Sequence, residues 1–224
     1  MRNTLLHILF VLIALAVLLA ELIENKMLTW AAKPLIMVWV IAYYLINTRK
    51  KEHSNTIVLA FLAAWLGDVL LMFQSRGAAF FMLGLGSFLV CQLLYAKNFA
   101  KKVLAVGLKS NWLFKEPIWL LLLFFYMVSL YIAMYPGLGS TLKLPVFVYA
   151  LAISSMAAAA LSRKRLVDKK SYKLILVGSL LFVLSDSLLG LNKFSLTIPQ
   201  AGFWVLLTYM AAQYFIVRGL VLKT

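Results

Sequence analysis

Acidic residues, histidine and cysteine are all scarce in this chain of 224 residues. Seven Asp and Glu stand against 22 Lys and Arg, with two histidines and one cysteine. The single Cys91 excludes a disulfide framework and a thiolate metal cluster within the chain. His7 and His53 lie near the ends of two apolar stretches, so neither a histidine cluster for zinc nor a Ser-His-Asp triad is available. We therefore expect no metal and no cofactor.

Two common catalytic motifs are also missing. No Gly-x-Ser-x-Gly elbow occurs, and Gly84-Leu85-Gly86 precedes no phosphate-loop lysine and lies in an apolar stretch. Gly84, Ser87 and Cys91 would share one helix face, where small residues favour close helix packing. The glycines thus indicate packing and not nucleotide binding.

Hydrophobic residues dominate what is present. They make up 64% of the chain, and the mean hydropathy is +0.96, far above that of a soluble domain. Runs of about 17–25 apolar residues can cross a bilayer as helices. The sequence predicts an all-α polytopic membrane protein, a single integral membrane domain over 1–224, with eight transmembrane helices at 5–23, 28–46, 56–73, 78–96, 117–134, 144–161, 173–191 and 200–221.

The first apolar stretch resembles a signal peptide, because Arg2 precedes an apolar run from Leu5 to Ala20. That run is long, and Glu21-Leu22-Ile23-Glu24 offers no small-x-small cleavage site. We expect a retained first helix.

The Lys and Arg residues behind the formal charge of +15 are unevenly divided between the loops on the two sides of the membrane. With both termini cytoplasmic, as in a bacterial inner membrane, only Lys26, Arg76, Lys143 and Lys193 fall outside, which matches the positive-inside rule. The excess therefore indicates orientation and contact with membrane lipids, and no nucleic acid. Seventeen basic residues fall inside: Arg2, Arg49, Lys50, Lys51, Lys97, Lys101, Lys102, Lys109, Lys115, Arg163, Lys164, Arg165, Lys169, Lys170, Lys173, Arg218 and Lys223.

Short motifs that recur in the two halves of the sequence suggest an internal repeat. Elements four helices apart have the same orientation, so the matches predict two parallel four-helix repeats over 1–103 and 113–224. The alternative is that apolar helices look alike by chance. In the repeat interpretation, Asp68 with Gln92 and Asp186 with Gln213 form two halves of one central site. The matches are Lys33-Pro34 with Lys143-Leu144-Pro145, Gly67-Asp68-Val69-Leu70-Leu71 with Ser185-Asp186-Ser187-Leu188-Leu189, and Phe88 to Gln92 with Tyr209 to Gln213.

Asp68 and Asp186 lie within apolar stretches, where a carboxylate is costly and marks a functional site by default. At 1.5 Å per residue, Asp68 lies about 9 Å below the outer turn and Asp186 about 10 Å below it, with Lys33 at a similar level. Glu21 ends the first helix nearer the surface, as a rim residue.

Two close carboxyl groups hold one proton between them, which supplies an acid and a base at one place. That arrangement suits hydrolysis, in which one group protonates the substrate and the other activates water. The alternative is that each aspartate bonds a neighbouring helix. For Tyr95, Tyr209 and Gln213, site lining and polar contacts between helices both remain open.

Together these residues resemble a known family. Lys33-Pro34-Leu35, the two aspartate motifs, the Phe81 to Tyr95 stretch and Tyr209-x-x-x-Gln213 are similar in order and spacing to the YhhN family of lysoplasmalogenases. The resemblance implies an eight-helix hydrolase that cleaves the vinyl-ether bond of lysoplasmalogens, which are lysophospholipids. It also implies that Asp68 and Asp186 are the catalytic pair, supported by Lys33, Gln92, Tyr95, Ser185, Tyr209 and Gln213.

The chain departs from this family at Gln92, where the usual pattern has histidine. Glutamine cannot be a general acid or base. Either Gln92 has a positioning role, or the activity of this chain differs from that of the family. Gln213, its counterpart in the second repeat, favours positioning. Two other classes fit the sequence: a proton-coupled transporter that uses the same aspartates, and a structural membrane protein without turnover.

Overall fold

The computed structural model describes residues 2–49, 53–108 and 111–222, and within these ranges it contains helices and no strand. Eight helices are long and apolar enough to cross a membrane, which confirms the predicted spans. They are α1 (Arg2–Leu22), α2 (Lys26–Asn47), α3 (Asn55–Met72), α4 (Ala78–Val106), α6 (Ile118–Met134), α7 (Ser140–Ser162), α8 (Lys169–Phe194) and α9 (Ala201–Val221). Short elements are η2 (Gln74–Arg76), α5 (Trp112–Lys115) and η4 (Tyr135–Gly137).

The helix ends follow local sequence signals. The Asn25 side chain caps α2 by accepting a hydrogen bond from the Leu28 amide at 3.0 Å. Asp168 caps α8 by accepting from the amides of Lys170 and Ser171. Such caps satisfy backbone donors that have no partner inside the helix.

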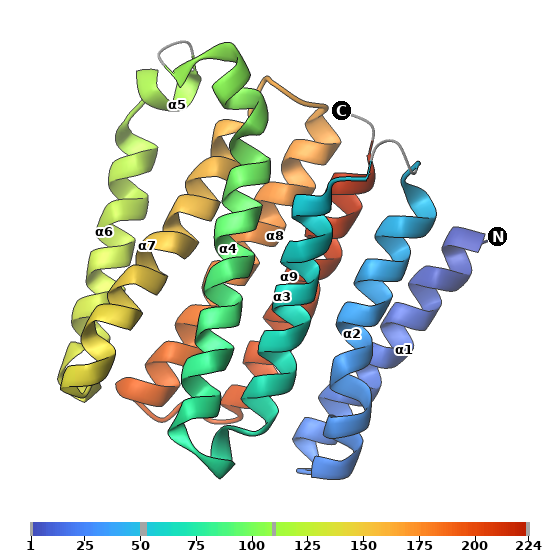
Figure 1. Cartoon of the computed structure of the whole chain (residues 1–224), viewed down its shortest axis with the longest axis vertical. Coiled ribbons are helices and arrows are strands. Elements are labelled where there is room, and N and C mark those ends of the chain that lie inside the picture. Colours follow the sequence, from blue (N-terminus) through green and yellow to red (C-terminus); the bar gives the residue numbers. More distant parts are fainter. Residues whose placement is uncertain (1, 50–52, 109–110, 223–224) are drawn as a thin grey trace.

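Six helices form a closed ring, in which each packs on two neighbours: α2, α3, α4, α7, α8 and α9, with α9 returning to α2 (Figure 1). Outside the ring, α1 packs on α2 and α9, and α6 packs on α7 and α8. Within the ring, contacts in the first half have counterparts in the second, since α2 with α3 matches α7 with α8, and α2 with α9 matches α7 with α4. The outer helices differ, because α1 packs on α9 whereas its counterpart α6 packs on α8. The two parallel repeats therefore stay a proposal that the ring contacts support.

The interior of the ring is filled by large side chains, among which Phe61, Tyr95, Phe99 and Phe182 are fully buried. The two outer helices bury little of their surface, with only 17% of the span in α1 and 11% of that in α6 inside the molecule. Their remaining apolar side chains are suited to contact lipid tails.

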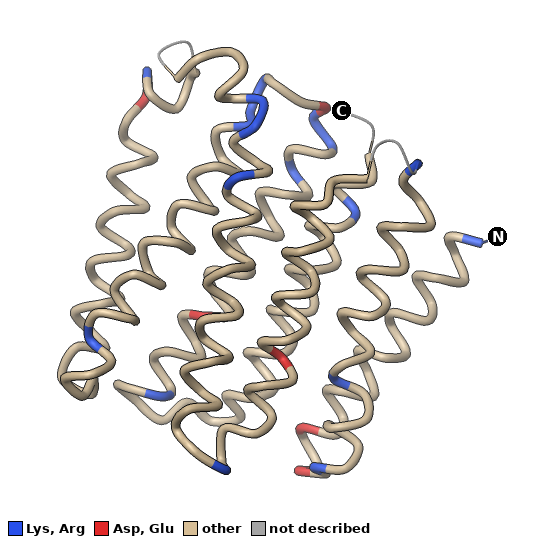
Figure 2. Tube along the Cα trace, viewed as in Figure 1, with Lys and Arg blue, Asp and Glu red and all other residues tan. Residues whose placement is uncertain are grey.

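Both termini lie at one end of the bundle, and most Lys and Arg residues gather at that end (Figures 1 and 2). We call this the terminal end, and the end with η2 and η4 the opposite end. Lys50, Lys51, Lys109 and Lys223 of the predicted inner set lie outside the described residues.

Candidate active site

Each of the six ring helices contributes one polar side chain to a cluster in the ring interior. These side chains are Lys33 on α2, Asp68 on α3, Gln92 on α4, Tyr149 on α7, Asp186 on α8 and Tyr209 on α9. The sequence predicted five of the six as site residues and missed Tyr149, because a lone tyrosine in an apolar span carries no local signal.

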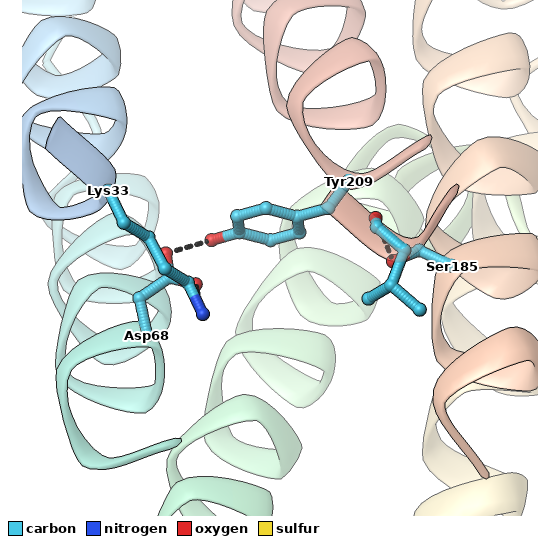
Figure 3. A network of polar contacts seen from close by, with 5 residues as sticks. Lys33, Asp68, Ser185 and Tyr209 are labelled. Atoms are coloured by element: carbon cyan, nitrogen blue, oxygen red, sulfur yellow. Dashed lines mark hydrogen bonds and ion pairs between the residues drawn. The ribbon is translucent and has the colours of Figure 1, made fainter. Parts of the chain in front are cut away.

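Asp68 is only 2% exposed and is held by a cation and a phenol. The Tyr209 hydroxyl donates to Oδ2 of Asp68 at 2.6 Å, and Nζ of Lys33 lies 3.9 Å from its Oδ1. Figure 3 shows Lys33 and Tyr209 reaching Asp68 from α2 and α9. The hydroxyl and the ammonium group both stabilise the negative charge of an ionised Asp68.

Asp186 has neutral neighbours instead. The Tyr149 hydroxyl and Nε2 of Gln92 both donate to Oδ2 of Asp186, the latter at 3.2 Å. Over the part of the chain that the structure describes, Lys33 with Asp68 is the one ion pair, so Asp186 has no cation within 4.0 Å. The two aspartates of the repeated motif therefore occupy chemically different environments.

The hydrogen bonds cross between the two halves of the chain. The repeat interpretation paired Gln92 with Asp68, and this was wrong, because the Gln92 amide donates to Asp186. Tyr209, from the second half, likewise bonds Asp68 in the first. The crossing follows from the ring, in which α4 packs on α7 and α9 packs on α2.

The remaining predicted residues lie beside this cluster. Tyr95 donates to Oε1 of Gln213 at 2.7 Å, which links α4 to α9 through a fully buried bond. Gln213 was expected beside Asp186, but its one hydrogen bond in the structure is to Tyr95. The Ser185 hydroxyl donates to the Val205 carbonyl at 2.9 Å and ties α8 to α9 (Figure 3).

A cavity of about 500 Å³, lined by polar and apolar side chains, connects the cluster with the opposite end of the bundle. We call it the polar cavity, because charged side chains line it from the cluster to its mouth. Lys33, Asp68, Ser185, Asp186 and Tyr209 line its inner part. Its outer part is lined by charged and polar residues near the helix ends: Glu21, Lys26, Gln74, Ser75, Asn192 and Lys193. Both carboxyl groups therefore face one shared cavity.

A second, apolar pocket meets this cavity at Asp186. It lies among α4, α6, α7 and α8, and Asp186, Leu71, Phe88 and Leu189 line both spaces. Its other walls are mainly aromatic and aliphatic, with one serine and one glycine: Phe81, Leu85, Leu130, Met134, Val146, Tyr149, Ala150, Ile153, Ser187, Gly190 and Phe194. Asp186 thus stands where a polar space changes to an apolar one.

Metal ligands are not grouped at this site. Across the described ranges, no three or more His, Cys, Asp or Glu residues are close enough to hold a metal ion. His7 contacts the Tyr214 hydroxyl and His53 the Thr48 carbonyl, so both histidines are engaged away from the aspartates.

The fold and the cavity define a polytopic membrane protein with a pair of carboxyl groups inside the bundle. The chain belongs to the YhhN family, whose model matches residues 28–220. It is similar to lysoplasmalogenase TMEM86A of Bos taurus, at 28% identity over 82% of this chain and 73% of the relative. The Homo sapiens lysoplasmalogenase TMEM86A is 27% identical over the same shares. No solved structure gives a significant match.

Proposed function

We propose that this protein is a hydrolase that cleaves the vinyl-ether bond of lysoplasmalogen-type lysophospholipids. The relatives named lysoplasmalogenase support the substrate class. The observation that carries the proposal is the meeting of the polar cavity and the apolar pocket at Asp186. A lysoplasmalogen has one hydrocarbon chain and one polar headgroup, joined near the bond to be cleaved.

In the proposed binding mode, the part of the alkenyl chain next to the vinyl ether enters the apolar pocket of about 60 Å³ among α4, α6, α7 and α8. The glycerophosphate part lies in the polar cavity. The vinyl ether then lies at the junction, next to Asp186 and facing Asp68. Lys33 neutralises one of the two carboxylates, which limits the cost of charge at this depth.

Asp186 is the general acid in this mechanism. Its neighbours are the neutral Tyr149 and Gln92, whereas Asp68 has an ammonium beside it. Of two carboxyl groups that share one proton, the group without a cation retains it. Asp186 donates this proton to the β-carbon of the vinyl ether, and the C=C electron pair forms the new C–H bond and leaves an oxocarbenium ion.

Asp68 is the carboxylate partner. Its negative charge stabilises the oxocarbenium ion. The carboxylate then accepts a proton from water as the water oxygen bonds to the α-carbon. The hydroxyl group of the resulting hemiacetal loses its proton as the C=O bond forms and the bond to the glycerol oxygen breaks. The glycerol oxygen takes up a proton in exchange, and a fatty aldehyde and a glycerophospho-alcohol are released. One water is consumed, and the protonation states of the pair are restored by proton exchange through the cavity.

Release of aldehyde tests the proposal. We expect the purified protein in detergent to convert a lysoplasmalogen to fatty aldehyde and to leave the saturated 1-O-alkyl analogue intact, because that analogue has no C=C bond to protonate. A transporter with the same aspartates would leave both lipids chemically unchanged, and that result would reject the hydrolase proposal.

The orientation is part of the proposal: both termini are cytoplasmic, in a bacterial inner membrane, and the cavity opens on the other side. Ser75 is exposed beside this opening, and the one native cysteine is fully buried. A membrane-impermeant thiol reagent added to intact cells should therefore label Ser75→Cys and spare Glu116→Cys, which lies in an exposed position at the terminal end. Labelling of Glu116→Cys alone would reverse the orientation.

A further inference from the structure

We infer that a groove between α6 and α8 binds the far part of the substrate's hydrocarbon chain, beyond the small pocket next to Asp186. This assignment rests on the proposed function, because it concerns the chain of the same substrate. We call this space the chain groove; its volume is about 530 Å³, and α5, α6, α7 and α8 form its walls. The side chains on these walls include Leu122, Tyr126, Ala157, Leu161, Leu176 and Leu180.

The apolar pocket at Asp186 is too small for a whole lipid chain. Its volume is about 60 Å³, against about 530 Å³ for the chain groove. A single-chain lipid therefore has to place most of its carbons elsewhere. All residues that line the chain groove except Lys164 are aliphatic or aromatic, so a hydrocarbon chain is suited to fill it.

The apolar pocket and the chain groove lie end to end along the same faces of three helices. On each helix, a residue at the pocket is followed in the groove by one four positions away, about one helical turn, and such residues share a face. The wall is therefore continuous from one space to the other. The pairs are Leu130 and Tyr126 on α6, Ile153 and Ala157 on α7, and Ser187 and Val183 on α8.

A hydrogen bond marks the boundary between the two spaces. The hydroxyl groups of Tyr126 and Ser187 lie 2.8 Å apart and join α6 to α8. Ser187 donates to the Val183 carbonyl at 2.6 Å, so the Tyr126 hydroxyl is the donor in the bond between the helices. Ser187 keeps its own bond when the exposed Tyr126 side chain turns towards the lipid. Opening this boundary for a chain therefore breaks one hydrogen bond.

The chain groove has the length of a lipid chain. Along α8, the distance from Asp186 to Tyr172, at the far end of the groove, is about 21 Å. Half of the hydrocarbon layer, the depth that one lipid chain fills, is about 15 Å. At the far end, Nζ of Lys164 lies 4.2 Å from the ring centroid of Trp112, and both residues line the groove. A chain that starts at Asp186 thus has room to end within the protein.

The chain groove is open to the membrane along one edge. Leu122, Leu180 and Leu184 line it and are exposed. The outer helix α6 stands at the edge of the bundle and buries little of its span (Figure 1). A lipid chain can therefore enter sideways from the hydrocarbon layer, between α6 and α8, without crossing the interior of the ring.

Two lysoplasmalogens that differ only in chain length, one hexenyl and one hexadecenyl, test the inference. Leu180→Trp narrows the groove about 9 Å from Asp186, beyond the end of the hexenyl chain but not of the hexadecenyl chain. We expect it to lower the ratio of kcat/KM for the long chain to that for the short chain about tenfold, as for overfilling a packed space. Val177→Trp is the control, because Val177 is exposed on the same helix and lines neither space. It should leave the ratio unchanged.

Leu176→Trp is the second blocking variant, about 15 Å from Asp186 on the same wall, and it decides the test if Leu180→Trp does not fold. It should lower the ratio in the same way. An unchanged ratio in a folded blocking variant would overturn the inference. An equal loss for both chains would overturn it too, because the substitution would then act on the aspartates and not on the chain.

A photo-crosslinking lipid locates the chain without turnover. The probe is an uncleavable 1-O-hexadecyl lysophospholipid with a diazirine at the end of its chain. We expect it to label the wall of the chain groove, and the unmodified lipid to compete with this labelling. Competed labelling only outside the groove, or no competed labelling, would overturn the inference. Labelling of the groove by a wild type that releases no aldehyde would reject the proposed function and retain the groove as a lipid site.

Discussion

Asp186→Asn is expected to lower kcat for aldehyde release about a thousandfold, the range found when a general acid is removed. The amide keeps the shape of the side chain and can still accept hydrogen bonds from Tyr149 and Gln92. It cannot deliver a proton to the vinyl ether. The measurement is steady-state aldehyde release by purified protein in detergent, with lipid binding followed in parallel to show that the site remains formed.

Asp168→Asn is the matched control for this variant. Asp168 caps the same helix at its other end, and asparagine caps a helix about as well as aspartate. Asp168→Asn should therefore retain both stability and turnover. Near-normal hydrolysis by Asp186→Asn would remove Asp186 from the mechanism, and Asp68→Asn tests the carboxylate partner in the same way.

Lys33→Met should reduce turnover at neutral pH and move the pH profile of kcat towards alkaline values. Lys33 lies 3.9 Å from Asp68 and is the cation that favours its ionised form. Without the ammonium, Asp68 stays protonated until a higher pH, and the mechanism needs it ionised. A higher pH ionises Asp68 even without the ammonium group of Lys33. Part of the activity of Lys33→Met should therefore return as the pH is raised.

Lys143→Met provides the control for Lys33→Met. Lys143 is the counterpart of Lys33 in the predicted second repeat, and it bonds the Tyr135 hydroxyl near the surface at 3.1 Å. Its removal should leave the pH profile in place. If Lys33→Met showed an unchanged profile with only a lowered melting temperature, Lys33 would have a structural role at the start of α2.

Most of the fold follows from the sequence, because apolar runs long enough to cross a bilayer can satisfy their backbone only as helices. The eight predicted spans are present, and most ends agree within a few residues. The main difference is α4, which continues to Val106 although its apolar run was predicted to end at residue 96. Hydropathy identifies only the part of a helix that lies in the hydrocarbon layer. A helix with Lys101 and Lys102 can extend beyond that layer into water.

The site was predicted only in part, for a physical reason. Asp68 and Asp186 stand out locally because a carboxylate in an apolar run is rare. Their partners come from helices that are neighbours only in the folded ring: Tyr209 reaches Asp68 across 141 positions, and Gln92 reaches Asp186 across 94. No local pattern contains such a pairing, so the sequence identified the aspartates and assigned Gln92 to the wrong one.

Hydrolysis in D2O tests the central claim most directly, because protonation of the β-carbon places one solvent hydrogen in the product. The purified protein in detergent is given a lysoplasmalogen in D2O, and the aldehyde is reduced as it forms and examined by mass spectrometry. We predict aldehyde and glycerophospho-alcohol in equal amounts, with one deuterium on the carbon next to the carbonyl. Intact lipid, or aldehyde without deuterium at that carbon, would contradict catalysis by proton transfer from Asp186.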